Sequence, residues 1–225
     1  MNKNYSCRIC NVEIKGTNIF DLKNIPLGVQ YFPLRDELDS EKAVNIELYE
    51  CEKCGLVQAH SSQVVYESEN SAATSFSSSM MKHKLDQAIN FISKYDLEGK
   101  SIFEAGCGDG HFLKLLQTAK AGLVVGVEPS IKSKETSSFK ENVKIYSDYI
   151  TSNFIIEEGP FDAFATFHVM EHIPDLHDFV KGISNNLKDN GIGLVEVPSS
   201  ELIFEDFRFY DIINDHLNYF TLGSL

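Results

Sequence analysis

The chain has 225 residues, of which 43% are hydrophobic and 24% are charged, a composition typical of a globular protein and not of a disordered one. Its 20 Lys and Arg residues against 33 Asp and Glu residues give a formal net charge of −13, which disfavours nucleic acid and anionic membranes as partners. No apolar run approaches the roughly 20 residues of a membrane-spanning helix, and the polar N-terminus lacks the apolar core of a signal peptide, so we expect a cytoplasmic protein.

The composition divides the chain into three stretches. Residues 1–60 carry cysteine pairs near both ends but too little apolar sequence for a core of their own, which predicts a small domain that needs a metal. Residues 61–79 are polar and rich in serine, and predict a linker or flap. Residues 80–225 alternate helical and apolar strand-like patterns, which predicts an α/β domain with a doubly wound, Rossmann-like parallel sheet.

The cysteine pairs are two CxxC motifs, separated by residues 11–50. Four thiolates can bind one zinc ion at about 2.3 Å each, and the two-residue spacer lets both sulfurs of a pair reach the same ion. The expected metal ligands are Cys7, Cys10, Cys51 and Cys54. A filled tetrahedral site leaves no position for a reacting water, so the zinc would be structural; a redox CxxC, chance pairing and iron are the alternatives.

Strands and helices follow each other in the third stretch. The apolar positions Leu85, Ala88, Ile89 and Ile92 predict a helix over 81–95. The alternation then predicts strands over 101–105, 122–128, 142–146, 161–167 and 191–198, and helices over 111–119, 131–140, 150–157 and 176–188. In such a sheet the ligand binds at the carboxyl ends of the strands.

A glycine-rich turn follows the first of these strands. Gly106 and Gly108 permit positive φ and close approach of a ligand to the backbone, and the next helix presents free amides. A P-loop lysine is missing, and Glu104 before the turn favours a ligand with positive charge over a pyrophosphate. Glu128, after the second strand, could accept both hydroxyls of a ribose. The alternative is that this segment is only a tight turn, and that the acidic residues near it bind no ligand.

These motifs resemble a known family. EAGCGDG, VEPS, YSDY and FHVMEHIPD, in this order, resemble the class I S-adenosylmethionine-dependent methyltransferases. The resemblance implies that Glu104, Gly106 and Gly108 border the methionine part of the cofactor, and that Glu128 binds its ribose. The full set of residues that we expect around the cofactor is Glu104, Gly106, Cys107, Gly108, Asp109, Glu128, Pro129, Asp148 and Tyr149 beside the adenine, and His168 near the methionine tail.

Residues 1–60 resemble a particular group within this family. CRIC, DLKNIPLGVQYFP and YECEKCGLVQ are similar to the zinc-binding domain that precedes the methyltransferase domain in sugar C-methyltransferases of deoxysugar pathways. The resemblance implies an acceptor that is a sugar or a nucleotide-linked sugar, in deoxysugar or polysaccharide synthesis. Carbon methylation beside a keto group also needs a base.

Two histidines are candidates for that base. His172 follows the fourth predicted strand in EHIPD, and His216 lies in NDHLNYF, which resembles the YHEHLSYF segment of the family. Asp215 stands where the family has Glu and could tune the imidazole, while Ile213 replaces the family tyrosine. With fewer groups to stabilise an enolate, O-methylation remains a rival to C-methylation, and a structural role remains open for both histidines.

The remaining alternatives concern the class of protein. A module that binds the cofactor without turnover, or a methyltransferase acting on another small molecule, stays open. A methyltransferase acting on RNA is disfavoured by the charge. The chain ends after five of about seven strands expected from the family, and an exposed sheet edge after GLVEVP favours a homodimer.

Overall fold

The structure is a computed structural model that describes residues 5–15, 18–27, 35–36, 38–40, 42–60, 77–130 and 143–225. The chain forms two compact units. Unit 1 contains the described residues up to 60, together with residues 168–177 and 197–225. Unit 2 contains the described residues of 77–167 and 178–196.

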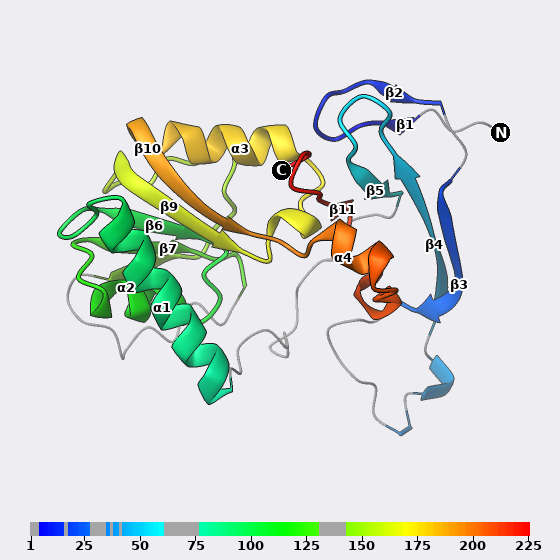
Figure 1. Cartoon of the computed structure of the whole chain (residues 1–225), viewed down its shortest axis with the longest axis horizontal. Helices are drawn as coiled ribbons and strands as arrows, with labels where there is room; N and C mark the ends of the chain where they lie inside the picture. Colours follow the sequence, from blue (N-terminus) through cyan, green and yellow to red (C-terminus); the bar gives the residue numbers. More distant parts are fainter. Residues whose placement is uncertain are drawn as a thin grey trace. The chain divides into compact units, whose positions relative to one another are not determined.

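Unit 2 is built on a parallel sheet of five strands (Figure 1). The strands lie in the order β10-β9-β6-β7-β8. The strand of this sheet that comes first in the chain, β6, is therefore at its centre, as the doubly wound topology requires. Neighbouring strands pair in parallel register, for example Glu104 of β6 with Gly126 of β7. The strands are β6 (Ile102–Ala105), β7 (Val124–Val127), β8 (Val143–Tyr146), β9 (Phe161–Phe167) and β10 (Leu187–Glu196).

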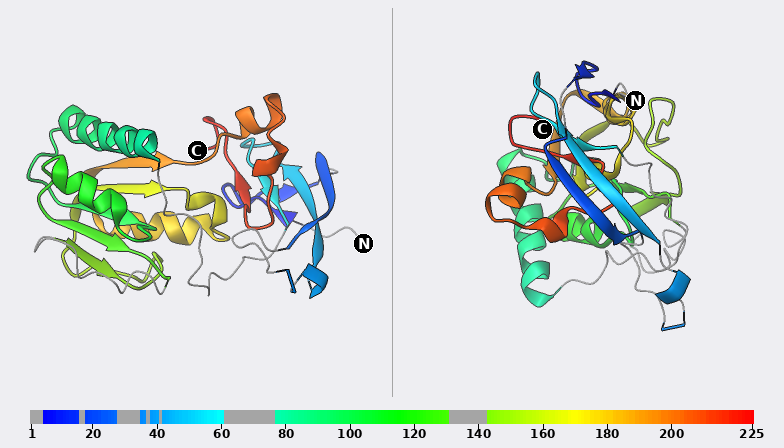
Figure 2. Two further views of the ribbon diagram at one scale, coloured as in Figure 1. Left: turned by 90° about the horizontal axis from the view of Figure 1, so that it is seen from below. Right: turned by 90° about the vertical axis from the view of Figure 1, so that its right-hand side faces the viewer.

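Helices cover both faces of this sheet (Figures 1 and 2). On one face lie α1 (Ser78–Lys94) and α2 (His111–Thr118), which pack with β6, β7 and β9 around a shared apolar core; α3 (Leu176–Asn185) covers the other face. Helix α1 begins at Ser78 because the hydroxyl of Ser77 accepts a hydrogen bond from the amide of Met80 at 3.2 Å. The predicted α/β class and parallel sheet are therefore confirmed.

Two details of the sequence prediction for unit 2 are wrong. Residues 150–157 contain only turns and irregular chain where we predicted a short helix, and the amide of Ile156 is held by the side chain of Asn186 instead. Ile89 is 45% exposed, whereas the buried face of α1 includes Lys84, Ala88 and Phe91, so helical spacing alone misplaced the apolar stripe. The helix predicted over 131–140 lies outside the described residues.

Unit 1 contains the N-terminal strands. A two-stranded sheet joins β1 (Tyr5–Ser6) to β2 (Glu13–Ile14), and the 3₁₀ turn η1 covers Leu38–Ser40. A second, antiparallel sheet has the order β11-β5-β4-β3. Its strands are β3 (Phe20–Pro26), β4 (Ala43–Glu50), β5 (Val57–Ala59) and β11 (Asn218–Tyr219).

The C-terminal part of the chain completes unit 1. Strand β11 pairs with β5, and the apolar side chains of β4 and β5 pack against Ile203 of α4 (Ser200–Glu205) and Ile212, next to η5 (Phe209–Asp211). The predicted boundary at residue 80 therefore differs from the structural division, because residues 168–177 and 197–225 belong with the N-terminal sheets. Residues 61–76 of the predicted linker lie outside the described residues, and residues 78 and 79 already belong to α1.

No helix in the described part of the chain has both the length and the apolar character to cross a membrane. Strand β10 occupies one end of the sheet of unit 2, and its pairing with a second subunit stays a prediction.

Candidate active site

The glycine-rich turn of unit 2 joins β6 to α2. Gly106, Gly108 and Gly110 have φ values of 76°, 53° and 75°, a left-handed backbone that glycine adopts without steric cost. The amide of Gly106 donates to the carbonyl of Val127 at 2.8 Å, which ties the turn to the end of β7. The sequence therefore places a tight backbone turn at the carboxyl edge of the sheet, where a ligand can approach closely.

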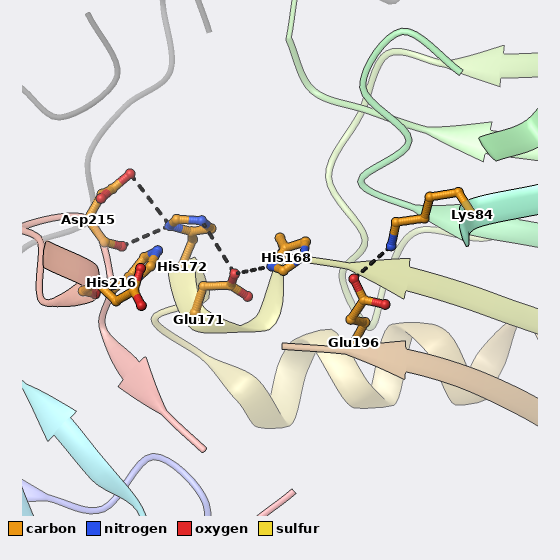
Figure 3. Close-up of polar contacts among 8 residues, drawn as sticks. Lys84, His168, Glu171, His172, Glu196, Asp215 and His216 are labelled. Atoms are coloured by element: carbon orange, nitrogen blue, oxygen red, sulfur yellow. Dashed lines mark hydrogen bonds and ion pairs between the residues drawn. The ribbon is translucent and has the colours of Figure 1, made fainter. Parts of the chain in front are cut away.

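Glu104 lies buried immediately before this turn. It is 3% exposed, and its Oε2 has no hydrogen-bond partner. Burial raises the pKa of Glu104 to about 8; Lys84 acts in the opposite direction, and the acids Asp109 and Glu128 add to the rise. Lys84 itself is bound to Glu196 at 2.7 Å (Figure 3). A buried carboxyl group with an unsatisfied oxygen fits a ligand that brings a positive charge, such as the ammonium of S-adenosylmethionine.

Glu128 follows β7 and faces the same turn. Its carboxylate accepts hydrogen bonds from the amides of Gly108 and Ser130, both at 3.0 Å, so its orientation is fixed. Asp109 is exposed and accepts a hydrogen bond from the amide of His111, the first residue of α2, at 3.1 Å. Pro129 follows Glu128, while Asp148 and Tyr149 lie exposed after β8. The roles predicted for these residues at the cofactor stay predictions.

The side chain of Cys107 points into the core of unit 2, where it is 6% exposed. A Cβ atom at Gly126 would lie 2.5 Å from its Sγ, so β7 needs glycine at this position. Burial raises the pKa of Cys107 well above its ordinary value, and this thiol stays neutral. Only the backbone of Cys107 remains available to a ligand at the turn.

The two candidate bases meet in unit 1. Their rings have centroids 4.9 Å apart, with His172 in the 3₁₀ turn η4 (Met170–His172) and His216 just before β11. Glu171, which sequence reasoning did not single out, lies beside them and is 1% exposed. Figure 3 shows its contacts with two histidines. Its Oε1 is 3.5 Å from His168 Nδ1 and 4.0 Å from His172 Nε2.

Hydrogen bonds define the tautomers of both rings. His172 Nδ1 donates to the backbone carbonyl of Asp215 at 2.9 Å, and His216 Nδ1 donates to that of Asp211 at 3.0 Å. A carbonyl only accepts, so Nδ1 carries the proton and Nε2 the lone pair. Burial, followed by the effect of nearby His172, lowers the pKa of His216 and favours its neutral form.

Asp215 contacts His172, and its charge also acts on His216 as expected, opposing the fall in the pKa of His216 that burial causes. Its carboxylate is buried, and its Oδ2 lies 3.7 Å from Nδ1 of His172. The contact with His172 was not expected from the sequence.

A buried amide holds this cluster together. Asn218 Nδ2 donates to the carbonyls of Met170 and Ile173 at 2.9 and 2.8 Å, and the amide of Leu217 donates to the carbonyl of Glu171 at 2.7 Å. These bonds fix η4 against the residues around His216. His168, which precedes η4, has φ of 54°, an uncommon conformation for a residue with a side chain.

The four paired cysteines form the second cluster of unit 1. The sulfurs of Cys7 and Cys54, and those of Cys10 and Cys51, are 3.4 Å apart, and all four lie within 4.8 Å of one another. A tetrahedral ion with bonds of about 2.3 Å separates its sulfurs by about 3.8 Å, so the geometry fits a metal.

The two CxxC motifs have the same local structure. Each is followed by a residue with positive φ, Asn11 at 56° and Gly55 at 73°. The amide of that residue donates to the carbonyl of the first cysteine of its motif. The repeated turn explains how both pairs present two sulfurs to one point.

The parallel sheet, its glycine turn and the acid after the second strand define a class I methyltransferase domain. A family model described as a methyltransferase domain matches residues 78–225, and the chain belongs to that family of S-adenosylmethionine-dependent enzymes. The YcgJ protein of Bacillus subtilis has the same fold, with a TM-score of 0.51 and 16% identity over 64% of each chain.

Curated relatives carry methyltransferase names. The C-methyltransferase NovU of Streptomyces niveus is 25% identical over 97% of this chain and 53% of its own length. The ubiquinone biosynthesis O-methyltransferase of Neisseria meningitidis serogroup C is 28% identical over 43% of each protein. The chain thus spans about half or less of the length of these relatives.

Proposed function

We propose that this protein transfers the methyl group of S-adenosylmethionine to a sugar or nucleotide-linked sugar in deoxysugar or polysaccharide synthesis. The observation that carries the proposal is the similarity to a C-methyltransferase over 97% of the chain, which includes the cysteine motifs and the residues around His216. Relatives named as O-methyltransferases match less than half of the chain. Carbon is therefore the first choice of acceptor atom, and oxygen the second.

The residues around the glycine turn would hold the cofactor. Bound S-adenosylmethionine supplies an electrophilic methyl group on a positively charged sulfur. Glu104 offers a buried carboxylate for the ammonium, the left-handed glycines allow close approach, and Glu128 offers oxygens to the ribose. For Asp148, Tyr149 and His168 the proposed contacts rest on the family resemblance alone.

The proposed base is His216, with His172 as the alternative. The neutral His216 ring keeps its proton on Nδ1 through the carbonyl of Asp211, so Nε2 can take a proton from the acceptor. Asp215 would orient His172 through its carbonyl and carboxylate. The cluster thus supplies a proton acceptor, and positioning supplies most of the remaining catalysis.

The four cysteines are proposed to hold one structural zinc ion. Their side chains form part of the apolar core of unit 1, with Leu56, Leu176 and Phe220. A metal that organises this core would support the segments that carry Glu171, His172 and His216. Its role is structural because four thiolates leave no position for a substrate.

Mass spectrometry of reactions with S-adenosylmethionine and a panel of keto and non-keto nucleotide sugars tests the proposal. One added methyl group on a keto sugar, with deuterium exchange at the adjacent carbon, is the expected result. His216→Ala should abolish exchange and transfer, while His83→Ala on the exposed face of α1 should leave both unchanged. Methylation of a hydroxyl without exchange would move the assignment to O-methylation, and no product from any sugar would refute the sugar acceptor.

A further inference from the structure

Unit 1 contains a second group of side chains able to bind a metal ion. Glu171, His172 and His216 each offer one ligand atom, and these atoms all lie within 4.8 Å of one another. The group shares no residue with the cysteine cluster. Two imidazoles and one carboxylate are the donor set of many sites for first-row transition metals.

The hydrogen bonds of both rings suit metal binding. Each ring gives its Nδ1–H to a backbone carbonyl, at 2.9 Å for His172 and 3.0 Å for His216. Histidines that bind metals through Nε2 are commonly oriented in this way, because the second bond fixes the ring and keeps the lone pair on the ligating nitrogen. The carboxylate of Asp215, 3.7 Å from His172 Nδ1, adds a negative charge behind that ring.

The buried carboxylate gives an independent reason to expect a ligand. Glu171 is 1% exposed, and its Oε2 is buried without a hydrogen-bond partner. A buried carboxylate oxygen that is left unsatisfied is costly unless a cation binds it. The hydrogen bond from the amide of Leu217 to the carbonyl of Glu171 fixes the backbone that carries this side chain.

The spacing also fits a single ion. Three atoms at the corners of a triangle with sides of 4.8 Å are about 2.8 Å from its centre, so inward movements of about 0.7 Å give bonds of about 2.1 Å. Rotation of the side chains covers such distances. Three protein ligands leave further coordination positions for water.

We propose that Glu171, His172 and His216 bind one divalent first-row transition metal ion. An ion bound through Nε2 of His216 would occupy the nitrogen that is proposed to take the proton from the acceptor, so the protein with the ion would lack that base. This consequence rests on the proposed function.

Cobalt(II) titration of the 225-residue chain, first loaded with zinc on its cysteines, tests the binding without any acceptor. Calorimetry gives the number of ions bound, and visible absorption distinguishes their ligands, because cobalt on thiolates produces an intense sulfur charge-transfer band. We expect one cobalt ion per chain without that band. Glu171→Gln should weaken the binding by about tenfold or more, whereas His83→Ala should leave it unchanged.

A second measurement uses the wild-type protein, so that its result does not depend on whether the variants fold. Proton NMR of the cobalt form should show two strongly shifted exchangeable signals, one from each Nδ1–H of the ligating rings. Absence of these signals, binding that is equal in Glu171→Gln, or cobalt found only on sulfur would overturn the proposal. Failure to methylate any sugar would refute the proposed function instead, since cation binding is measured separately.

Discussion

The unusual state of Glu104 makes cofactor binding dependent on pH. With a pKa of about 8, this carboxyl group is about nine-tenths protonated at pH 7 in the ligand-free protein. If the ammonium of S-adenosylmethionine binds the ionised form, binding at pH 7 releases about 0.9 proton, and affinity rises about ninefold from pH 6 to pH 7. Calorimetry in buffers of different ionisation enthalpy measures both quantities.

The same shift affects stability with a definite sign. The pKa is raised from 4.5, so its stabilising effect is complete below about pH 4.5 and is lost as the pH rises through 8, by up to about 5 kcal/mol. Glu104→Gln should remove the proton release and the pH dependence and weaken binding, whereas His83→Ala, at an exposed residue of α1, should retain the release. Wild-type binding at pH 7 without proton release would refute the reasoning.

Three further changes test the packing. The guanidinium of Arg8 donates hydrogen bonds to the carbonyls of Leu217 and Ala59, both at 2.9 Å. Arg8→Met should therefore lower the free energy of unfolding, measured by urea titration, by about 2–4 kcal/mol. It should leave the affinity for the cofactor unchanged. Chelation of the proposed zinc ion should remove hydrogen-exchange protection from β11 before β6, because the cysteines belong to the core of unit 1; simultaneous loss would contradict this order. Gly126→Ala should cost roughly 1–3 kcal/mol in thermal or urea unfolding, and less in a Cys107→Ala background, since the added Cβ meets that sulfur.

The sequence predicted the parts of the fold that depend on local pattern. Five short apolar runs gave the five strands of the parallel sheet, and the turn at Gly106 and Gly108 was placed correctly because left-handed backbone leaves a clear glycine signal. The paired CxxC motifs also predicted that four distant cysteines meet. Such signals lie within a few residues of each other or in a repeated motif.

The prediction failed where contacts between residues far apart in the chain determine the structure. The pairing of β11 with β5 joins residues far apart in the chain, and nothing local in Asn218 or Tyr219 indicates it. For the same reason the sequence did not reveal the importance of Glu171, a residue within a quoted motif whose burial depends on the chain around Leu217. Lys84 was also missed, because a lysine on a helix is usually exposed.

The antiparallel sheet of unit 1 has its last strand near the end of the described chain. During synthesis, β3, β4 and β5 leave the ribosome long before β11, with all of β6 to β10 in between. The edge of β5 therefore stays unpaired until β11 has been made. By that time every strand of the sheet of unit 2 is already present. An unpaired edge invites pairing with other chains, so the newly made protein is most prone to aggregate in this interval. Zinc captured early by the cysteines would shorten the exposure by ordering the residues next to that edge.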